Sequence, residues 1–360
     1  MNRLSHHRRG FSLVELMVAM AIGLFVSAAV ISVYLVQARM YKSTASQVAI
    51  QNAENAISAL VTPVIRSAGF NGCSAVTQSL SNLNSGGPPP LGTITTTASL
   101  LFGYDATGTA GGGSTLSITQ DNSANDISAG DWSPALDATL AGNVEAGSDV
   151  IVVLGAAPDT SPVGVTTIAT ASNSMILQTA AGLSAGQIGV VSDCLKASIF
   201  QITAISANTI THAAGSGAMA NSSSTLAVNY APGSQFVPLQ QTAFYIAHGT
   251  GDQSTLMRAV YSNGAWAAQP LVPGVEAMQV LYGIGANGIV TQYVAAGAVS
   301  DWTKVYAIRL GFLVQGLLGS GTTSNTASRQ FSILGTTVTV PADGRLRHVY
   351  ELTINLRNAV

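Results

Sequence analysis

A nearly continuous apolar run occupies the N-terminal part of the chain, from Phe11 to Val36. Glu15 carries the only charged side chain in this run. At about 1.5 Å per residue, a helix over the run is long enough to cross the roughly 30 Å hydrocarbon core of a bilayer with some tilt. The pattern therefore predicts a membrane-spanning helix over residues 11–36.

The apolar residues that follow this run recur at steps of three and four, which predicts that the helix continues as an amphipathic rod. Pro63 is expected to end or kink it, because proline lacks an N–H and its ring clashes with the preceding turn. The predicted helix therefore covers residues 11–62. The positions expected to face the rest of the protein are Ala45, Val48, Ala49, Ala53, Ala56, Ile57 and Leu60.

The rest of the chain has strand patterns separated by turn residues. Residues 147–154 form a strong buried-strand signal, and five good strands are predicted after residue 236. These five are predicted within residues 244–248, 255–260, 275–282, 305–314 and 347–356. Shorter strands are expected around residues 165–169, 174–178, 188–192, 198–204 and 225–229. The patterns predict an α+β protein: a long helix packed on an antiparallel β-sheet head with a large β-rich insertion.

Four segments follow from these patterns. They are a leader (1–10), the helix (11–62), a β-rich variable region (63–235) and a C-terminal β-sheet region (236–360).

Glu15 is a problem for a membrane-spanning helix, because an uncompensated carboxylate in a bilayer costs several kcal/mol. If the chain is cut after Gly10, the new α-amino group of Phe11 lies one helical turn from Glu15 and supplies a cation. A secretory signal peptide is cut after its apolar region, whereas this cut precedes the region and retains it. Gly10, Phe11 and Glu15 are therefore the candidate site residues. An ordinary membrane anchor with an accidental glutamate is the alternative.

The G-F-S-L-V-E-L-M-V-A-M run at residues 10–20 resembles the class III leader junction of type IV prepilins. The resemblance implies that Gly10 ends the leader removed by the prepilin peptidase. It also implies that Phe11 becomes the N-methylated first residue. Glu15 would be the acidic fifth residue that pairs with the N-terminal amine during assembly. A type IV pilin-like fold is implied as well.

Three further strings resemble the PilW group of minor pilins. They are A-G-F-N-G-C at residues 68–73, V-P-G-V-E-A-M-Q-V-L-Y-G at 272–283 and R-L-R-H-V-Y-E-L-T-I-N-L-R-N at 345–358. The resemblance implies a minor pilin that primes or caps a type IV pilus, supporting twitching motility, adhesion or DNA uptake. Its partners would be other minor and major pilins, the prepilin peptidase and the inner membrane. The alternatives are a type II secretion pseudopilin of the J class and a tip adhesin carried on a pilin stem.

Charge limits the partners further. Charged residues make up only 8% of the chain, and the net charge is −2. Removing the leader leaves 11 basic and 16 acidic side chains, a net charge of −5. No basic field suited to phosphates is present, so direct binding of nucleic acid is not expected. Arginines concentrated before the apolar run favour a cytoplasmic N-terminus, with the head in the periplasm and, after assembly, in a surface pilus.

The two cysteines, Cys73 and Cys194, are expected to form one disulfide in an oxidising periplasm. On the chain-entropy model such a loop contributes roughly 4–5 kcal/mol of stability. Two unrelated buried thiols are the alternative.

The sequence contains no G-x-S-x-G elbow, P-loop or zinc-ligand spacing, so neither an enzyme nor a cofactor is expected. The Asp-rich stretch 121–126 predicts a polar loop in preference to a calcium site. Arg345, Arg347 and Arg357 form a basic cluster. An interface with another pilin is preferred for it over weak DNA contact and over a salt-bridged strand edge.

Overall fold

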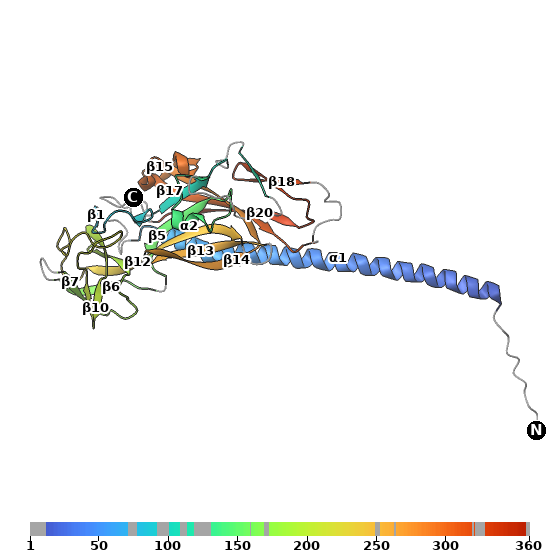
Figure 1. The fold of residues 1–360 in the computed structure, drawn as a ribbon, viewed down its shortest axis with the longest axis horizontal. Coiled ribbons are helices and arrows are strands. Elements are labelled where there is room, and N and C mark those ends of the chain that lie inside the picture. The colour runs from blue at the N-terminus through green and yellow to red at the C-terminus, as the bar shows by residue number, and fades with distance from the viewer. Residues whose placement is uncertain are drawn as a thin grey trace, which may run out of the picture.

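The computed structural model shows a long helix that carries a β-rich head at its C-terminal end (Figure 1). The helix projects from the head as a free rod, and the N-terminal end of α1 lies far from the head. The structure describes residues 12–70, 78–91, 101–108, 114–118, 131–158, 160–168, 173–248, 253–262, 264–318, 320 and 328–357. The predicted α+β class is confirmed.

The helices are α1 (Leu13–Arg66) and α2 (Ala138–Ala141), with two 3-10 turns, η3 (Ala296–Ala298) and η4 (Trp302–Lys304). The strands before the long strand β12 are β1 (Gln78–Ser81), β2 (Leu101–Ala106), β3 (Thr115–Ser117), β4 (Trp132–Ser133), β5 (Val150–Ala156), β6 (Val163–Ile168), β7 (Ser174–Leu177), β8 (Ile188–Ser192), β9 (Lys196–Gln201), β10 (Ala204–Ser206) and β11 (Thr209–Thr211). The remaining strands are β12 (Gln235–His248), β13 (Ser254–Ser262), β14 (Ala265–Pro273), β15 (Val275–Ala286), β16 (Ile289–Val294), β17 (Val305–Gln315), β18 (Arg329–Ile333), β19 (Thr336–Val340) and β20 (Arg347–Asn355).

Strand β12 joins the two parts of the largest sheet. Its first residues pair with β8 and β6 of the middle region, and its later residues pair antiparallel with β5 and β13. A separate antiparallel sheet has the order β16-β15-β17-β20, and a small sheet joins β18, β19 and β3. The predicted boundary between residues 235 and 236 thus falls at the start of a strand that belongs to both regions. The division into segments stays a prediction.

The head-facing line of α1 differs from the predicted one by about one residue. The buried positions recur at steps of three and four and are Ser46, Ile50, Ala53, Ile57, Val61 and Ile65. They pack across β20, β17, β14 and β5 in the main core. Ala53 and Ile57 are as predicted, but Val48 and Leu60 are 49% and 44% exposed.

The helix also continues to Arg66, one turn past the predicted end at residue 62. Pro63 lies inside its last turn, where its carbonyl accepts a hydrogen bond from the Ser67 N–H. The missing proline N–H therefore does not stop a helix whose final turn, including Val61 and Ile65, is buried against the sheets.

The five strands predicted after residue 236 are confirmed within β12, β13, β15, β17 and β20. Strands β14, β16, β18 and β19 were missed. Residues 225–229 form no strand, although one was predicted there. That segment contains turn-forming polar residues, and its apolar Leu226 and Val228 pack against a neighbouring core from irregular backbone.

Candidate functional site

The N-terminal part of α1 makes no buried contact with the head. From Leu13 to residue 45, none of the helical residues is buried, and most of the large exposed hydrophobic side chains of the described chain lie here. The helix is long and apolar enough to cross a membrane. Over residues 13–36 this surface is apolar on all sides except at Glu15, so it needs lipid or other helices as its surroundings.

Glu15 is held in a capping box at the first turn of α1. The Ser12 hydroxyl accepts a hydrogen bond from the Glu15 N–H at 3.2 Å, and the Ser12 N–H donates to the Glu15 carboxylate at 3.0 Å. This reciprocal pair satisfies two otherwise unpaired donors, and the positive end of the helix dipole favours the carboxylate there. The Glu15 carboxylate is therefore directed back toward the start of the helix.

The predicted partners of Glu15 at the cleavage point, Gly10 and Phe11, lie outside the described residues. Ser12 was missed as a site residue, although the S-x-x-E spacing of a capping box is visible in the sequence. The cleavage, methylation and ion pair stay predictions.

Two serines interrupt the apolar surface of α1 without leaving their hydroxyls unpaired. Ser27 donates to the Gly23 carbonyl at 2.8 Å, and Ser32 donates to the Ala29 carbonyl at 2.7 Å. Bonding to the preceding turn removes the need for water, so these residues are compatible with a lipid environment.

Ser46 is the first buried residue of α1, and it is hydrogen-bonded to the head. The Leu317 N–H donates to the Ser46 hydroxyl at 3.0 Å. About two helical turns further along α1, the Glu54 carboxylate lies 2.6 Å from the ring Nδ1 of His348 on β20. The loop approaches so closely that a β-carbon on Gly316 would lie 2.8 Å from the Ser46 Cβ. Glycine is therefore needed at this crossing point.

Arg347, next to the contact between Gly316 and Leu346, is the centre of a buried ion cluster. Its guanidinium donates two hydrogen bonds to Glu276 at 2.6 and 2.8 Å and two to Asp343 at 2.8 and 2.6 Å. Arg345 contacts Asp343 at 3.4 Å. Burial alone would raise the pKa of Asp343, but the hydrogen bonds and charges of the two arginines lower it overall. The preferred interpretation of Arg345 and Arg347 as an interface was wrong, because both are used inside the head. Arg357 remains exposed after β20.

Cys194 lies in the turn between β8 and β9, with a left-handed backbone (φ 71°). Cys73 lies outside the described residues. The disulfide between them stays a prediction. The Asp-rich stretch 121–126 also lies outside the described residues.

Asp105 on β2 is a buried carboxylate with an unpaired oxygen among the described residues. Burial raises its pKa to about 6. Folding therefore disfavours the charged form, so the stability contributed by this group is complete below its ordinary pKa of 3.8 and is lost as the pH rises through about 6.

We expect Asp105→Asn to raise the free energy of unfolding of the head at pH 8 by roughly 1–3 kcal/mol and to change it little at pH 4. Denaturant unfolding of the full chain in detergent, followed by tryptophan fluorescence, measures both values. Asp301→Asn is the matched control. The pKa of this surface carboxyl is shifted in the opposite direction, because a hydrogen bond from the Thr303 side chain lowers it. A gain for Asp105→Asn that is equal at both pH values would contradict the prediction.

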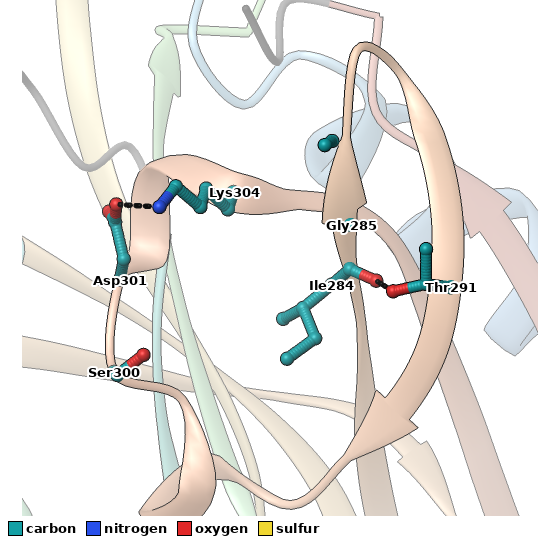
Figure 2. Close-up of a pocket in the computed structure, with 7 residues that line it drawn as sticks. Ile284, Gly285, Thr291, Ser300, Asp301 and Lys304 are labelled. Atoms are coloured by element: carbon teal, nitrogen blue, oxygen red, sulfur yellow. Dashed lines mark hydrogen bonds and ion pairs between the residues drawn. The ribbon is translucent and has the colours of Figure 1, made fainter.

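A hollow of about 270 Å³ lies between the β15–β16 hairpin and η4. Figure 2 shows Ile284 and Thr291 on one side of it and Asp301 paired with Lys304 on the other. This pair spans 3.4 Å, and both side chains are well exposed. Ser300 also lines the hollow, and no hydrogen bond joins it to Asp301 or Lys304 in the part of the chain that the structure describes.

Comparisons with known proteins agree with this geometry at both ends of the chain. Residues 5–31 match the model of the prokaryotic N-terminal methylation motif, which defines a chain with a prepilin-type N-terminus. Residues 243–358 match the model of the PilW family, described as Type IV pilus-assembly protein W. The resemblance to the PilW family predicted from the sequence is therefore confirmed over residues 243–358, and the predicted prepilin-type N-terminus is supported over residues 5–31. Neither match reaches residues 32–242.

Among solved structures, the chain is similar to a type IV-like pilin from Thermus thermophilus. The two are 23% identical, the similarity covers 34% of this chain and 68% of that chain, and the TM-score is 0.22. No curated protein sequence matches the chain.

Proposed function

We propose that the protein is a large minor pilin that primes or caps a type IV pilus. Its role is structural and not catalytic. The peptidase removes residues 1–10 in the inner membrane, Phe11 is methylated, and the head folds in the periplasm. The exposed half of α1 then moves from lipid into a bundle with the helices of other pilins.

One observation carries this proposal. The exposed apolar half of α1 coincides with the methylation motif, and its only carboxylate is held at the first turn. An ordinary anchor needs the apolar surface but gains nothing from the glutamate. A subunit that leaves lipid for a helical bundle needs both, because an ion pair with a neighbouring amine sets its axial position. Neither ion is then buried alone, which is the costly case.

The mature N-terminus tests the proposal directly. Full-length chain produced with its prepilin peptidase is expected to begin at Phe11 with a methylated α-amino group, as measured by mass spectrometry. Gly10→Leu is expected to leave the precursor uncut, because a bulky side chain keeps the protease from the backbone. Ser5→Leu, at another leader position, is the control and should be processed normally. A mature-sized Gly10→Leu product would contradict the proposal.

If processing is normal, loss of twitching on gene deletion supports a pilus subunit, whereas loss of protein export supports the pseudopilin.

A further inference from the structure

A groove crosses the head where the long strand β12 changes neighbours. Strand β8 pairs with β12 at residues 235–238, and β13 pairs with it at residues 241–248. Leu239 and Gln240 therefore have a partner from neither strand. A hollow of about 580 Å³ opens over this gap, between the loop before β8 and the end of β13. This volume lies in the range of small-ligand sites.

The lining of the groove is polar but uncharged. No Asp, Glu, Lys, Arg or His is among the described residues that line it. Hydroxyl groups come from Ser184 and Ser262, and amides come from several glutamines. A groove without cations is unsuited to phosphate, sulfate or carboxylate groups, and one without anions is unsuited to amines or metal ions.

Three of these glutamines each use one half of the amide within the protein. Gln187 accepts a hydrogen bond from the Ser184 N–H at 3.2 Å, and Gln240 accepts from Arg258 at 2.9 Å. Gln201 donates to the Gly186 carbonyl at 3.2 Å. The internal bonds fix the direction of each amide. The side-chain NH2 groups of Gln187 and Gln240 and the side-chain Oε1 of Gln201 then have no partner in the described part of the chain.

Two fixed donors and one fixed acceptor suit a ligand whose groups both donate and accept. Hydroxyl groups do so, whereas a backbone amide or carbonyl does only one. Gln241 differs from the other three because both halves of its amide bind the segment at Pro88 and Leu91, so it only shapes the floor.

One wall of the groove is aromatic. Tyr261, at the end of β13, is half-buried and lines the groove. The ring of Trp266 on β14 supports it edge-on, with centroids 5.2 Å apart. A rigid ring beside fixed amides offers an apolar face and polar groups together, which is the combination that one face of a sugar ring requires.

We propose that this groove binds a neutral oligosaccharide. Amides and serine hydroxyls hydrogen-bond the sugar hydroxyls, and Tyr261 packs against the apolar face of one ring. The inference rests on the head alone and not on pilus assembly. Charged polysaccharides and nucleic acids are not expected ligands, because the groove has no cation to receive them.

The full chain, purified in a zwitterionic detergent without a sugar head group, is tested by titration calorimetry. The probes are neutral oligosaccharides of glucose, galactose, mannose, xylose and N-acetylglucosamine, with a heparin-derived oligosaccharide as the charged comparison. Binding of at least one neutral series is expected, with none of heparin. Tyr261→Ala and Gln187→Ala are each expected to weaken that binding at least tenfold.

Tyr293→Ala and Gln292→Ala, on β16 and outside the groove lining, are the matched controls and should bind normally. Ala185→Trp fills the groove from an exposed loop position, so it should block binding without changing the thermal unfolding of the head. Failure of every neutral series to bind would overturn the proposal. So would binding that survives both Tyr261→Ala and Ala185→Trp, or binding of heparin alone.

Discussion

Replacing Glu15 with valine is expected to leave the subunit in the membrane but to lower its recovery in sheared pili at least tenfold. Valine makes the apolar run more hydrophobic, so insertion becomes easier. The variant loses the carboxylate that the Ser12 N–H now binds, and with it the proposed partner of the mature amine. Membrane and pilus fractions quantified by immunoblot give the two amounts.

Two variants separate the cap from the charge. Ser12→Ala removes one hydrogen bond of the capping box, which costs about 1 kcal/mol of local helix stability, yet keeps the carboxylate. Glu15→Gln keeps a hydrogen-bond acceptor at the same place but removes the charge. If the ion pair directs assembly, Glu15→Gln should resemble the valine variant and Ser12→Ala should resemble the unaltered chain. Normal amounts of the Glu15→Val subunit in pili would refute the prediction.

Replacing Arg347 with methionine is expected to destabilise the head by roughly 3–5 kcal/mol, because it leaves two buried carboxylates without their cation. Both Glu276 and Asp343 depend on this guanidinium for two hydrogen bonds each. In a head of this size the midpoint of thermal unfolding should fall by roughly 10 °C. Circular dichroism of the full chain in detergent measures the midpoint.

Arg309→Met is the matched control. Arg309 pairs with Glu351 at 3.2 Å, but the two side chains are 39% and 38% exposed. Such a pair contributes about 1 kcal/mol or less.

The destabilisation of the head by Arg347→Met should also become smaller at low pH. The stability that Asp343 contributes is complete above its ordinary pKa of 3.8 and is lost as the pH falls through its lowered pKa. Equal destabilisation by the two methionine variants would contradict the prediction.

The long helix could be predicted from sequence because its signal is local and continuous. Which face of this helix packs against the head was harder to predict. Alanine-rich positions around Ala45 and Ala49 give the same period as the line that is buried. Ser46 looks polar, and only the Leu317 N–H, 271 residues away, shows why it is inside. The buried end of the helix likewise depended on the sheets beneath Val61 and Ile65.

Some residues of the candidate site could likewise be predicted from the local sequence, and others could not. Glu15 was evident because a carboxylate in an apolar run conflicts with local physics, and Ser12 was available through its spacing to Glu15. Arg347 was misassigned because its partner Glu276 is 71 residues distant in the chain, so charge pattern alone could not pair them. The groove beside β12 had no sequence signal, because the gap arises from the register of two strands from different regions.

The stretch between β5 and β12 begins and ends at neighbouring positions of the large sheet, and this has a consequence for evolution. Strand β5 ends at Ala156, and Leu239 of β12 lies directly opposite it in the sheet. The strands between them, β6 to β11, form the other part of this sheet, and that part begins and ends at neighbouring positions. Because closing a longer loop costs little extra entropy, this stretch can lengthen or shorten while the strands that contact α1, which are β5, β14, β17 and β20, keep their pairing with neighbouring strands. The match to the family model begins just after this stretch, at residue 243. A change of length in this stretch is therefore expected to alter the part of the head built from β6 to β11 without altering the strands that contact α1.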